Sequence, residues 1–251
     1  NHGPSNGTHG VGLVEKASDP ASEPDVDKDS PKAPQTKTVS ISSFANKLVV
    51  AWVGYRLKGG KEVHSTASAA SINLLDVTAV PRVTIAQKLD VLSSQAKCAG
   101  HRAVLEAAHE YQRFFAPEIT AAGKYAPCQV MVLGAGVAGL AAISTAVALG
   151  SSVRAWDVRD IHDQIESLGA SWITVDFKEE GAGTGGYAKE SSQEFQKAQK
   201  ETFHRHAKAC DIIILTAAIP GRPSPRLMED YMVADMRPGS VIVDLAAMGG
   251  G

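Results

Sequence analysis

The sequence predicts an α/β protein of two lobes, each built on a doubly wound parallel sheet, with the first lobe incomplete. Short apolar runs alternate with helical patterns from residue 125 to residue 251, and a glycine-rich turn joins the first run to its helix. A shorter alternation of the same kind lies between residues 38 and 90. Because strands that alternate with helices form parallel sheets, both regions belong to the α/β class.

Length and composition limit the possible function classes. The chain has 251 residues, of which 44% are hydrophobic and 21% are charged, as in ordinary globular proteins. A formal charge of -2 gives no reason to expect nucleic acid or an anionic membrane surface as a partner. The three cysteines, Cys98, Cys128 and Cys210, lack the spacing of metal ligands. We therefore expect neither a disulfide framework nor a metal site.

Residues 1–37 form a low-complexity segment with five prolines and no aromatic residue. Such a segment buries too little apolar surface to offset its ordering entropy, so we expect it to be disordered. The chain begins with Asn1 and ends directly after an apolar run. We therefore expect a piece of a longer protein, in which residues 1–37 are either a tail or an insertion in the first lobe.

The first lobe and the link that follows it have weaker patterns. We expect a strand at 38–42, a helix at 44–57 that stops at Gly59 and Gly60, and a strand at 71–75. Apolar residues at helical spacing then predict a helix over 86–115, with a break at Gly100. This helix occupies most of a linking region that we assign to residues 91–124.

The second lobe, residues 125–251, alternates regularly. A glycine-rich loop at 177–186 interrupts the alternation before its last helix. The expected strands are 129–133, 152–156, 171–175, 211–216 and 240–245, and the expected helices are 137–149, 161–168 and 189–209. This order predicts one parallel sheet with helices on both faces.

The strongest motif is the glycine turn Gly134-Ala135-Gly136-Val137-Ala138-Gly139. It follows an apolar strand and opens an alanine-rich helix, which is the context that a dinucleotide-binding turn requires. Gly134 permits the tight turn, Gly136 lets the backbone approach a pyrophosphate, and Gly139 lets the helix pack closely on the strand. The first helical N–H groups then face the phosphates. A Rossmann-like lobe is therefore expected.

An acidic residue completes the motif. Asp157 ends the next strand, 23 residues after Gly134, close to the separation of about 20 that the pattern requires. A carboxylate there accepts hydrogen bonds from the ribose hydroxyls and repels a 2′-phosphate, so NAD(H) is favoured over NADP(H), although Arg159 weakens this argument. FAD and a turn that serves packing alone remain as alternatives.

Four further segments, 81–96, 185–190, 216–223 and 239–246, resemble the NAD(H)-binding domain of proton-translocating nicotinamide nucleotide transhydrogenases, within the alanine dehydrogenase/transhydrogenase superfamily. The resemblance covers residues 38–251, with the segments in the family's order. It implies that Arg82, Gln87 and Asp90 position the nicotinamide without acid or base catalysis. Departures at Ile85, Lys88 and Ala218 put the contact details there in doubt.

The resemblance also implies the remaining contacts of the nucleotide. Arg82 would pair with Asp90, Ser93 would bond the carboxamide, and Tyr187 would lie on a mobile loop that closes over the ring. Together with the turn, the implied cofactor-binding set is Arg82, Val83, Thr84, Gln87, Ser93, Gly134, Gly136, Val137, Ala138, Gly139, Asp157, Val158, Arg159, Gly186, Tyr187, Gln199 and Ala218.

The activity that the resemblance implies is hydride transfer from NADH to NADP⁺ held by a partner domain, coupled to proton translocation by a transmembrane domain. It also implies a homodimer that reaches the membrane only through its partner domain. The location would be the matrix side of the mitochondrial inner membrane in a eukaryote, or the cytoplasmic face of the inner membrane in a bacterium. Two alternatives remain: an NAD-dependent amino-acid dehydrogenase like alanine dehydrogenase, and a non-catalytic nucleotide-binding module.

Overall fold

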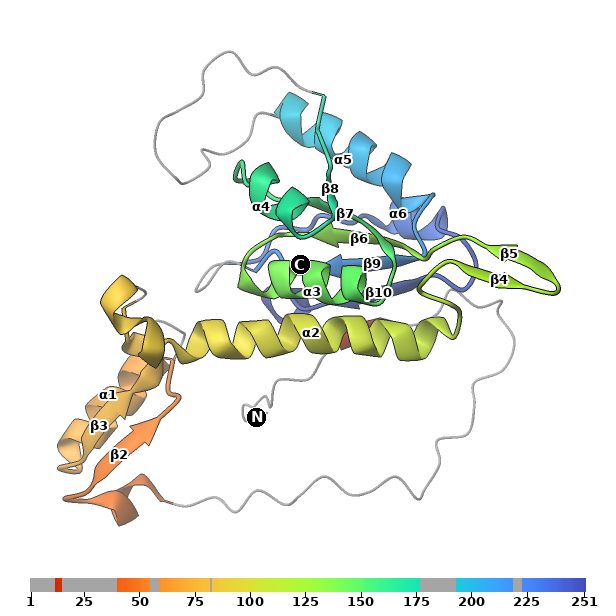
Figure 1. Ribbon diagram of the computed structural model, residues 1–251. Helices are drawn as coiled ribbons and strands as arrows, with labels where there is room; N and C mark the ends of the chain where they lie inside the picture. The colour runs from red at the N-terminus through yellow and green to blue at the C-terminus, as the bar shows by residue number, and fades with distance from the viewer. Residues whose placement is uncertain (1–11, 15–39, 55–58, 82, 177–192, 219–222) are drawn as a thin grey trace, which may run out of the picture. The chain divides into compact units, whose positions relative to one another are not determined.

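The computed structural model describes residues 12–14, 40–54, 59–81, 83–176, 193–218 and 223–251 (Figure 1). The chain divides into two compact units, one formed by residues 1–18 with 95–251 and the other by residues 19–94. The boundary at residue 95 falls inside the region that the sequence assigns to the link. Each unit has its own parallel strands, in agreement with the predicted α/β class.

The smaller unit is a single β-α-β arrangement. Strands β2 (Leu48–Ala51) and β3 (Asn73–Asp76) pair in parallel, and helix α1 (Gly60–Ala69) connects them. Short 3₁₀ helices lie at Ile41–Phe44, Val77–Ala79 and Thr84–Leu89. The strand predicted at 71–75 is confirmed within two residues.

Two predictions for the smaller unit are wrong. The helix predicted at 44–57 is the strand β2 over Leu48–Ala51, and Gly59 and Gly60 begin helix α1 where a helix stop was predicted. A short apolar run fits a strand and a helix equally well, and here pairing with β3 decides the outcome. The strand predicted at 38–42 is also not formed in its described part, where Ile41–Phe44 is a 3₁₀ helix.

The larger unit contains one six-stranded sheet. Strand order is β1-β10-β9-β6-β7-β8, and all neighbours pair in parallel except β1, which is antiparallel to β10. The strands are β1 (Gly12–Val14), β6 (Gln129–Leu133), β7 (Ser152–Trp156), β8 (Ser171–Trp172), β9 (Ile212–Leu215) and β10 (Val241–Asp244). The chain order reverses between β6 and β9, which is where doubly wound sheets bind their ligands.

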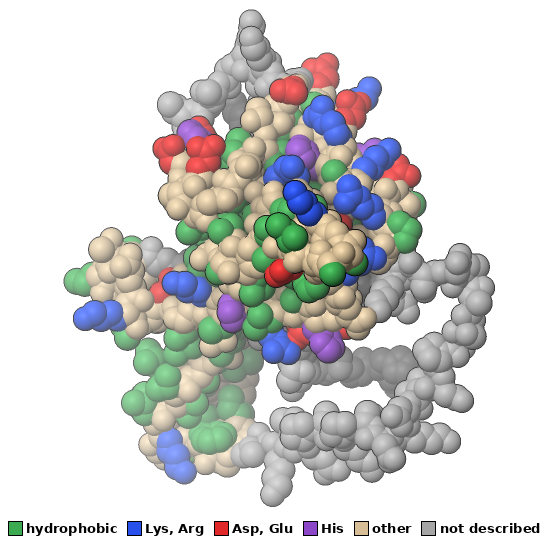
Figure 2. Space-filling view, turned by 45° about the vertical axis from the view of Figure 1, so that its right-hand side comes forward, with side chains coloured by type: hydrophobic (Ala, Val, Ile, Leu, Met, Phe, Trp, Pro, Cys, Tyr) green, Lys and Arg blue, Asp and Glu red, His purple; other side chains and the backbone are tan. Residues whose placement is uncertain are grey.

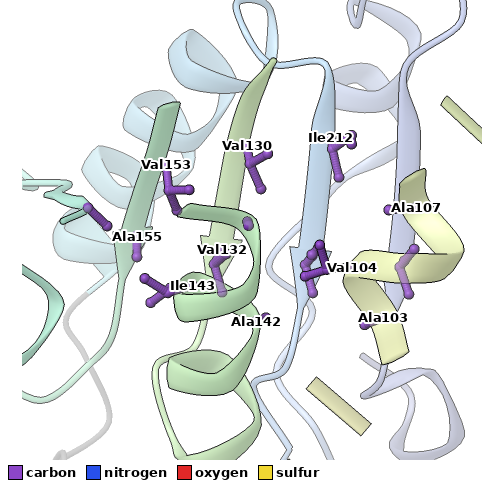
Figure 3. Close-up of a cluster of buried hydrophobic side chains, with 14 of the residues drawn as sticks. Ala103, Val104, Ala107, Val130, Val132, Ala142, Ile143, Val153, Ala155 and Ile212 are labelled. Atoms are coloured by element: carbon purple, nitrogen blue, oxygen red, sulfur yellow. The ribbon is translucent and has the colours of Figure 1, made fainter. Parts of the chain in front are cut away.

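Helices cover both faces of this sheet (Figure 1). Val132 of β6 packs with Ile143 of α3 and Val104 of α2 on one face, whereas Leu133 packs with Phe203 of α5 and Met232 of α6 on the other (Figure 3 shows the first cluster). The helices are α2 (Val91–Tyr111), α3 (Val137–Ala148), α4 (His162–Ser167), α5 (Gln193–Ala207) and α6 (Asp230–Ala234). Because successive strand residues face opposite sides, β6 is buried on both faces.

The strands and helices predicted for the second lobe are confirmed in order and type. The sequence missed the short helix α6 and an antiparallel hairpin of β4 (Glu118–Thr120) and β5 (Gly123–Tyr125). It also misplaced a break, because α2 runs unbroken through Gly100. A Cβ at Gly100 would lie 1.9 Å from the Ala138 carbonyl oxygen, so this glycine allows α2 to approach the start of α3.

Strand β1 lies inside the segment that the sequence predicts to be disordered. Residues 1–37 contain one short apolar run, at 11–14. Its residues Gly12–Val14 pair with Ile242–Asp244 of β10. Main-chain hydrogen bonds to an exposed sheet edge need little apolar burial, which is why composition alone does not predict this strand. The other residues of the segment lie outside those that the structure describes.

Candidate functional site

The glycine turn connects β6 to α3 at the carboxyl end of the sheet. Gly134 has φ of 98°, a left-handed conformation that favours glycine. Its amide donates to the Trp156 carbonyl at 2.8 Å, which ties the turn to the neighbouring strand β7. A Cβ at Gly134 would lie 2.9 Å from the Ala217 amide nitrogen, so the backbone that follows β9 closes the turn on its other side. Gly134 is therefore required by both conformation and packing.

The other two glycines of the motif have opposite surroundings. A Cβ on Gly139 would lie 1.9 Å from the Gly134 carbonyl oxygen, so Gly139 allows the helix to pack against the turn. A Cβ on Gly136 would meet nothing within 4 Å. Gly136 is also the N-cap of α3, and it supplies no side-chain hydrogen bond to the first helical amides. The first amides of α3 therefore face open space, and they can donate hydrogen bonds to an anion there.

Asp157 is anchored at the same turn. Its side chain is 7% exposed, and its Oδ2 accepts a hydrogen bond from the Ala135 amide at 2.7 Å. The Arg159 amide donates to Oδ1 at 2.9 Å. The acid therefore lies directly beside the start of α3, as the sequence motif predicts.

Arg159 holds the same carboxylate with its side chain. Its Nε donates to Oδ1 of Asp157 at 2.9 Å, and one terminal nitrogen donates to Oδ2 at 3.1 Å. Burial alone would raise the pKa of Asp157, but the hydrogen bonds from Arg159 and Ala135 outweigh it, so the pKa lies below its ordinary value. The hydrogen bond to Asp157 in turn raises the pKa of Arg159. Asp157 is therefore an anion at neutral pH.

Acid is expected to remove the stability that Asp157 contributes. The pKa of Asp157 is lower in the folded chain than in the unfolded chain, so its carboxylate stabilises the fold at pH values above the unfolded pKa. This contribution is lost as the pH falls through the folded pKa. Urea unfolding of the wild type and of Asp157→Asn, from about pH 6 to about pH 3, measures the contribution of this carboxylate to the free energy of unfolding. We expect the stability difference to shrink towards acid pH, and a constant difference would contradict this assignment.

Thr216 begins one of the four segments that carry the resemblance, but the sequence alone does not assign it to the site. Its Oγ1 donates to the Gly134 carbonyl oxygen at 2.8 Å from the carboxyl end of β9. Strand β9 is the neighbour of β6 across the point where strand order reverses. A hydroxyl residue directly after a fully buried strand was the available signal, but only the topology brings it to the turn.

The predicted nicotinamide loop lies in the smaller unit. There Asp90 caps helix α2: its Oδ1 accepts from the Ser93 amide at 3.0 Å and its Oδ2 from the Ser93 hydroxyl at 2.7 Å. The hydroxyl proposed for the carboxamide is thus used within the cap. Gln87 is exposed on a 3₁₀ helix, and Val83 and Thr84 beside it are exposed as well. Their predicted contacts with a nucleotide remain predictions.

The other predicted contacts divide between the turn and more distant positions. Val137 and Ala138 open α3, and Val158 follows Asp157, so all three belong to the turn. Gln199 is half-buried on α5, and Ala218 is exposed after β9. Arg82, Gly186 and Tyr187 lie outside the described residues, so the predicted pairing of Arg82 and the closing loop are untested.

The described surface adds little further chemistry. Figure 2 shows basic and acidic side chains interspersed on one face of the protein. Several charged side chains of the described residues pair locally, including Lys200 with Glu229 at 2.6 Å and Lys208 with Asp235 at 2.9 Å. Within the described ranges there is no group of three or more His, Cys, Asp or Glu side chains that could hold a metal ion. No helix among these residues has the length and apolar character needed to cross a membrane.

Comparison with known proteins finds relatives that match about three quarters of this chain. The "NAD(P) transhydrogenase subunit alpha" of Haemophilus influenzae is 55% identical over 191 residues, which are 76% of this chain and 37% of the relative. A transhydrogenase structure from Sinorhizobium meliloti has 41% identity and a TM-score of 0.73, covering 84% of this chain and 57% of that one. The chain thus spans well under two thirds of these relatives.

Alanine dehydrogenases are more distant. The enzyme of Mycolicibacterium smegmatis is 33% identical over 126 residues, which are 50% of this chain and 29% of the relative. A family model described as the C-terminal domain of alanine dehydrogenase/PNT matches residues 103–251, which include the glycine turn, Asp157 and Thr216. The chain therefore belongs to the alanine dehydrogenase/PNT C-terminal domain family.

Proposed function

We propose that the larger unit binds NAD(H) as part of a nicotinamide nucleotide transhydrogenase. The observation that carries this proposal is the hydrogen bond from the Ala135 amide to Asp157, which fixes an anionic carboxylate beside an uncapped helix start. A dinucleotide needs both features, since one meets its pyrophosphate and the other its adenosine ribose. The names of the transhydrogenase relatives supply the reaction type.

The residues present fit this cofactor. The open space at Gly136 admits a diphosphate to the first amides of α3, and a side chain there would fill that space. Asp157 offers two carboxylate oxygens for the two hydroxyls of the ribose. A 2′-phosphate would place a second anion against Asp157, which costs binding energy, so the site should prefer NAD(H).

The proposed reaction is direct hydride transfer from NADH to NADP⁺. The cofactors supply this chemistry, and the protein binds, aligns and keeps water away from the rings. We assign the alignment to Arg82, Gln87 and Asp90, and the covering of the site to the segment with Gly186 and Tyr187. These assignments rest on the family resemblance. No acid or base is required from the chain.

The partners are also part of the proposal. NADP(H) would be held by a separate domain of the same enzyme, and a membrane domain would couple the transfer to proton movement. The domain would form a homodimer and would meet the membrane only through its partner. The relatives' subunit name supports a larger assembly. An alanine dehydrogenase-like activity is the second candidate, but its relatives match half of this chain at lower identity.

A competitive titration of NADH and NADPH tests the cofactor assignment. Bound NADH changes its fluorescence, so the dissociation constants of both nucleotides are measurable directly with this chain. We expect NADH to bind at least about tenfold more tightly, because a 2′-phosphate would face the Asp157 carboxylate. Tighter binding of NADPH would overturn the assignment.

Gln87→Asn is expected to leave NADH affinity within about twofold and to slow hydride transfer about tenfold or more, because shortening this side chain disturbs ring alignment more than binding. Single-turnover transfer in the enzyme reassembled with its NADP(H)-binding domain measures the rate. Lys88→Ala, one residue away on the same exposed 3₁₀ helix, is the control. An unchanged rate for Gln87→Asn would remove Gln87 from its assigned role.

A further inference from the structure

The carboxylate of Asp157 has all of its acceptor positions in use. Oδ1 accepts from the Arg159 amide and from Arg159 Nε, both at 2.9 Å. Oδ2 accepts from the Ala135 amide at 2.7 Å and from a terminal nitrogen of Arg159 at 3.1 Å. An ionised carboxylate has about four lone-pair positions, so each oxygen here has its full number of donors.

The four donors are of two kinds. The amides of Ala135 and Arg159 are backbone groups that the turn holds in place. The two guanidinium donors belong to a side chain that is 53% exposed, and this side chain also reaches the Ala135 carbonyl oxygen at 3.4 Å. Rotation of the exposed Arg159 side chain into water removes these donors without moving the backbone. Another ligand can therefore replace only the two guanidinium donors and not the two backbone amides.

Two adjacent ribose hydroxyls present the same number of donors as the guanidinium edge. We infer that the Arg159 guanidinium occupies the position of the adenosine diol on Asp157, so that nucleotide binding exchanges two N–H donors for two O–H donors. Arg159 is thus a specificity-determining residue that competes with the ribose, and the inference rests on the proposed function. If this exchange occurs, the diol contributes to affinity only the difference between two interactions. One is the diol with Asp157 in the complex, and the other is Arg159 with Asp157 in the free protein.

This exchange predicts an unequal effect of Arg159→Ala on two nucleotides. In the wild type, a nucleotide without the diol leaves the Arg159–Asp157 pair intact, whereas a nucleotide with the diol must break it. In the variant, the diol meets an unpaired carboxylate and gains its full interaction. Loss of positive charge affects both nucleotides alike, because both carry the same phosphates. The ratio of their dissociation constants therefore isolates the competition.

The experiment measures binding of ADP and of 2′,3′-dideoxy-ADP to the full chain and to Arg159→Ala by calorimetry. We expect the dissociation constant of the dideoxy nucleotide divided by that of ADP to rise about threefold in the variant, the size typical of a partly exposed ion pair. If the protein binds ADP but the ratio stays the same or falls in the variant, the inference about Arg159 is overturned and the proposed function is not. A wild type that does not bind ADP overturns both this inference and the proposed function.

Discussion

Gly139→Ala is expected to lower the free energy of unfolding by about 3 kcal/mol and to abolish NADH binding, because the added methyl group has no room. Its Cβ would lie 1.9 Å from the Gly134 carbonyl oxygen and 2.8 Å from the Gly134 carbonyl carbon. Both atoms are backbone, so relief requires the start of α3 to move away from the turn. Calorimetric unfolding should show a melting temperature lower by roughly 6–12 °C for a domain of this size.

Gly136→Ala is the matched control within the same motif. Gly136 has φ of -70°, which any residue adopts, and a Cβ there meets nothing within 4 Å. We expect the free energy of unfolding to stay within about 0.5 kcal/mol of the wild type. NADH binding should still weaken by about tenfold or more, because the methyl group occupies the approach of the diphosphate. If Gly136→Ala binds normally, the helix start is not the phosphate site.

The glycine turn separates what the sequence could predict from what it could not. Spacing after an apolar strand identified Gly134, Gly136 and Gly139, because the conformational demands of the turn are local. The contact of Thr216 with Gly134 depends on strand order, since Thr216 follows β9 and lies 82 residues after Gly134 in the chain. Local patterns do not carry that information.

The same reasoning explains the errors in the first lobe and in the linking region. Leu48–Ala51 is too short for its period to separate a strand from a helix, and its parallel partner lies beyond an intervening helix. Gly100 was interpreted as a helix break from propensity, but its role is the close approach of two helices. In each case a contact distant in sequence outweighs the local preference.

Asp157→Ala is expected to weaken NADH binding about 100-fold, which corresponds to about 3 kcal/mol. A hydrogen bond to a charged group contributes about 1.5–3 kcal/mol, and the carboxylate accepts two from the ribose at the cost of those from Arg159. The truncation also leaves the Ala135 amide without its acceptor, so the free energy of unfolding should fall by about 1–2 kcal/mol. Fluorescence titration and urea unfolding measure the two effects separately.

Asp157→Asn separates the charge of this residue from its shape. The amide oxygen can still accept from Ala135, but the side chain no longer repels a phosphate or holds Arg159 as an ion pair. We therefore expect NADH to bind more weakly and NADPH more tightly than in the wild type, so that the preference between them narrows. If both nucleotides weaken by the same factor, Asp157 supports the turn without selecting the cofactor, because only a charge that faces the 2′ position distinguishes a hydroxyl from a phosphate.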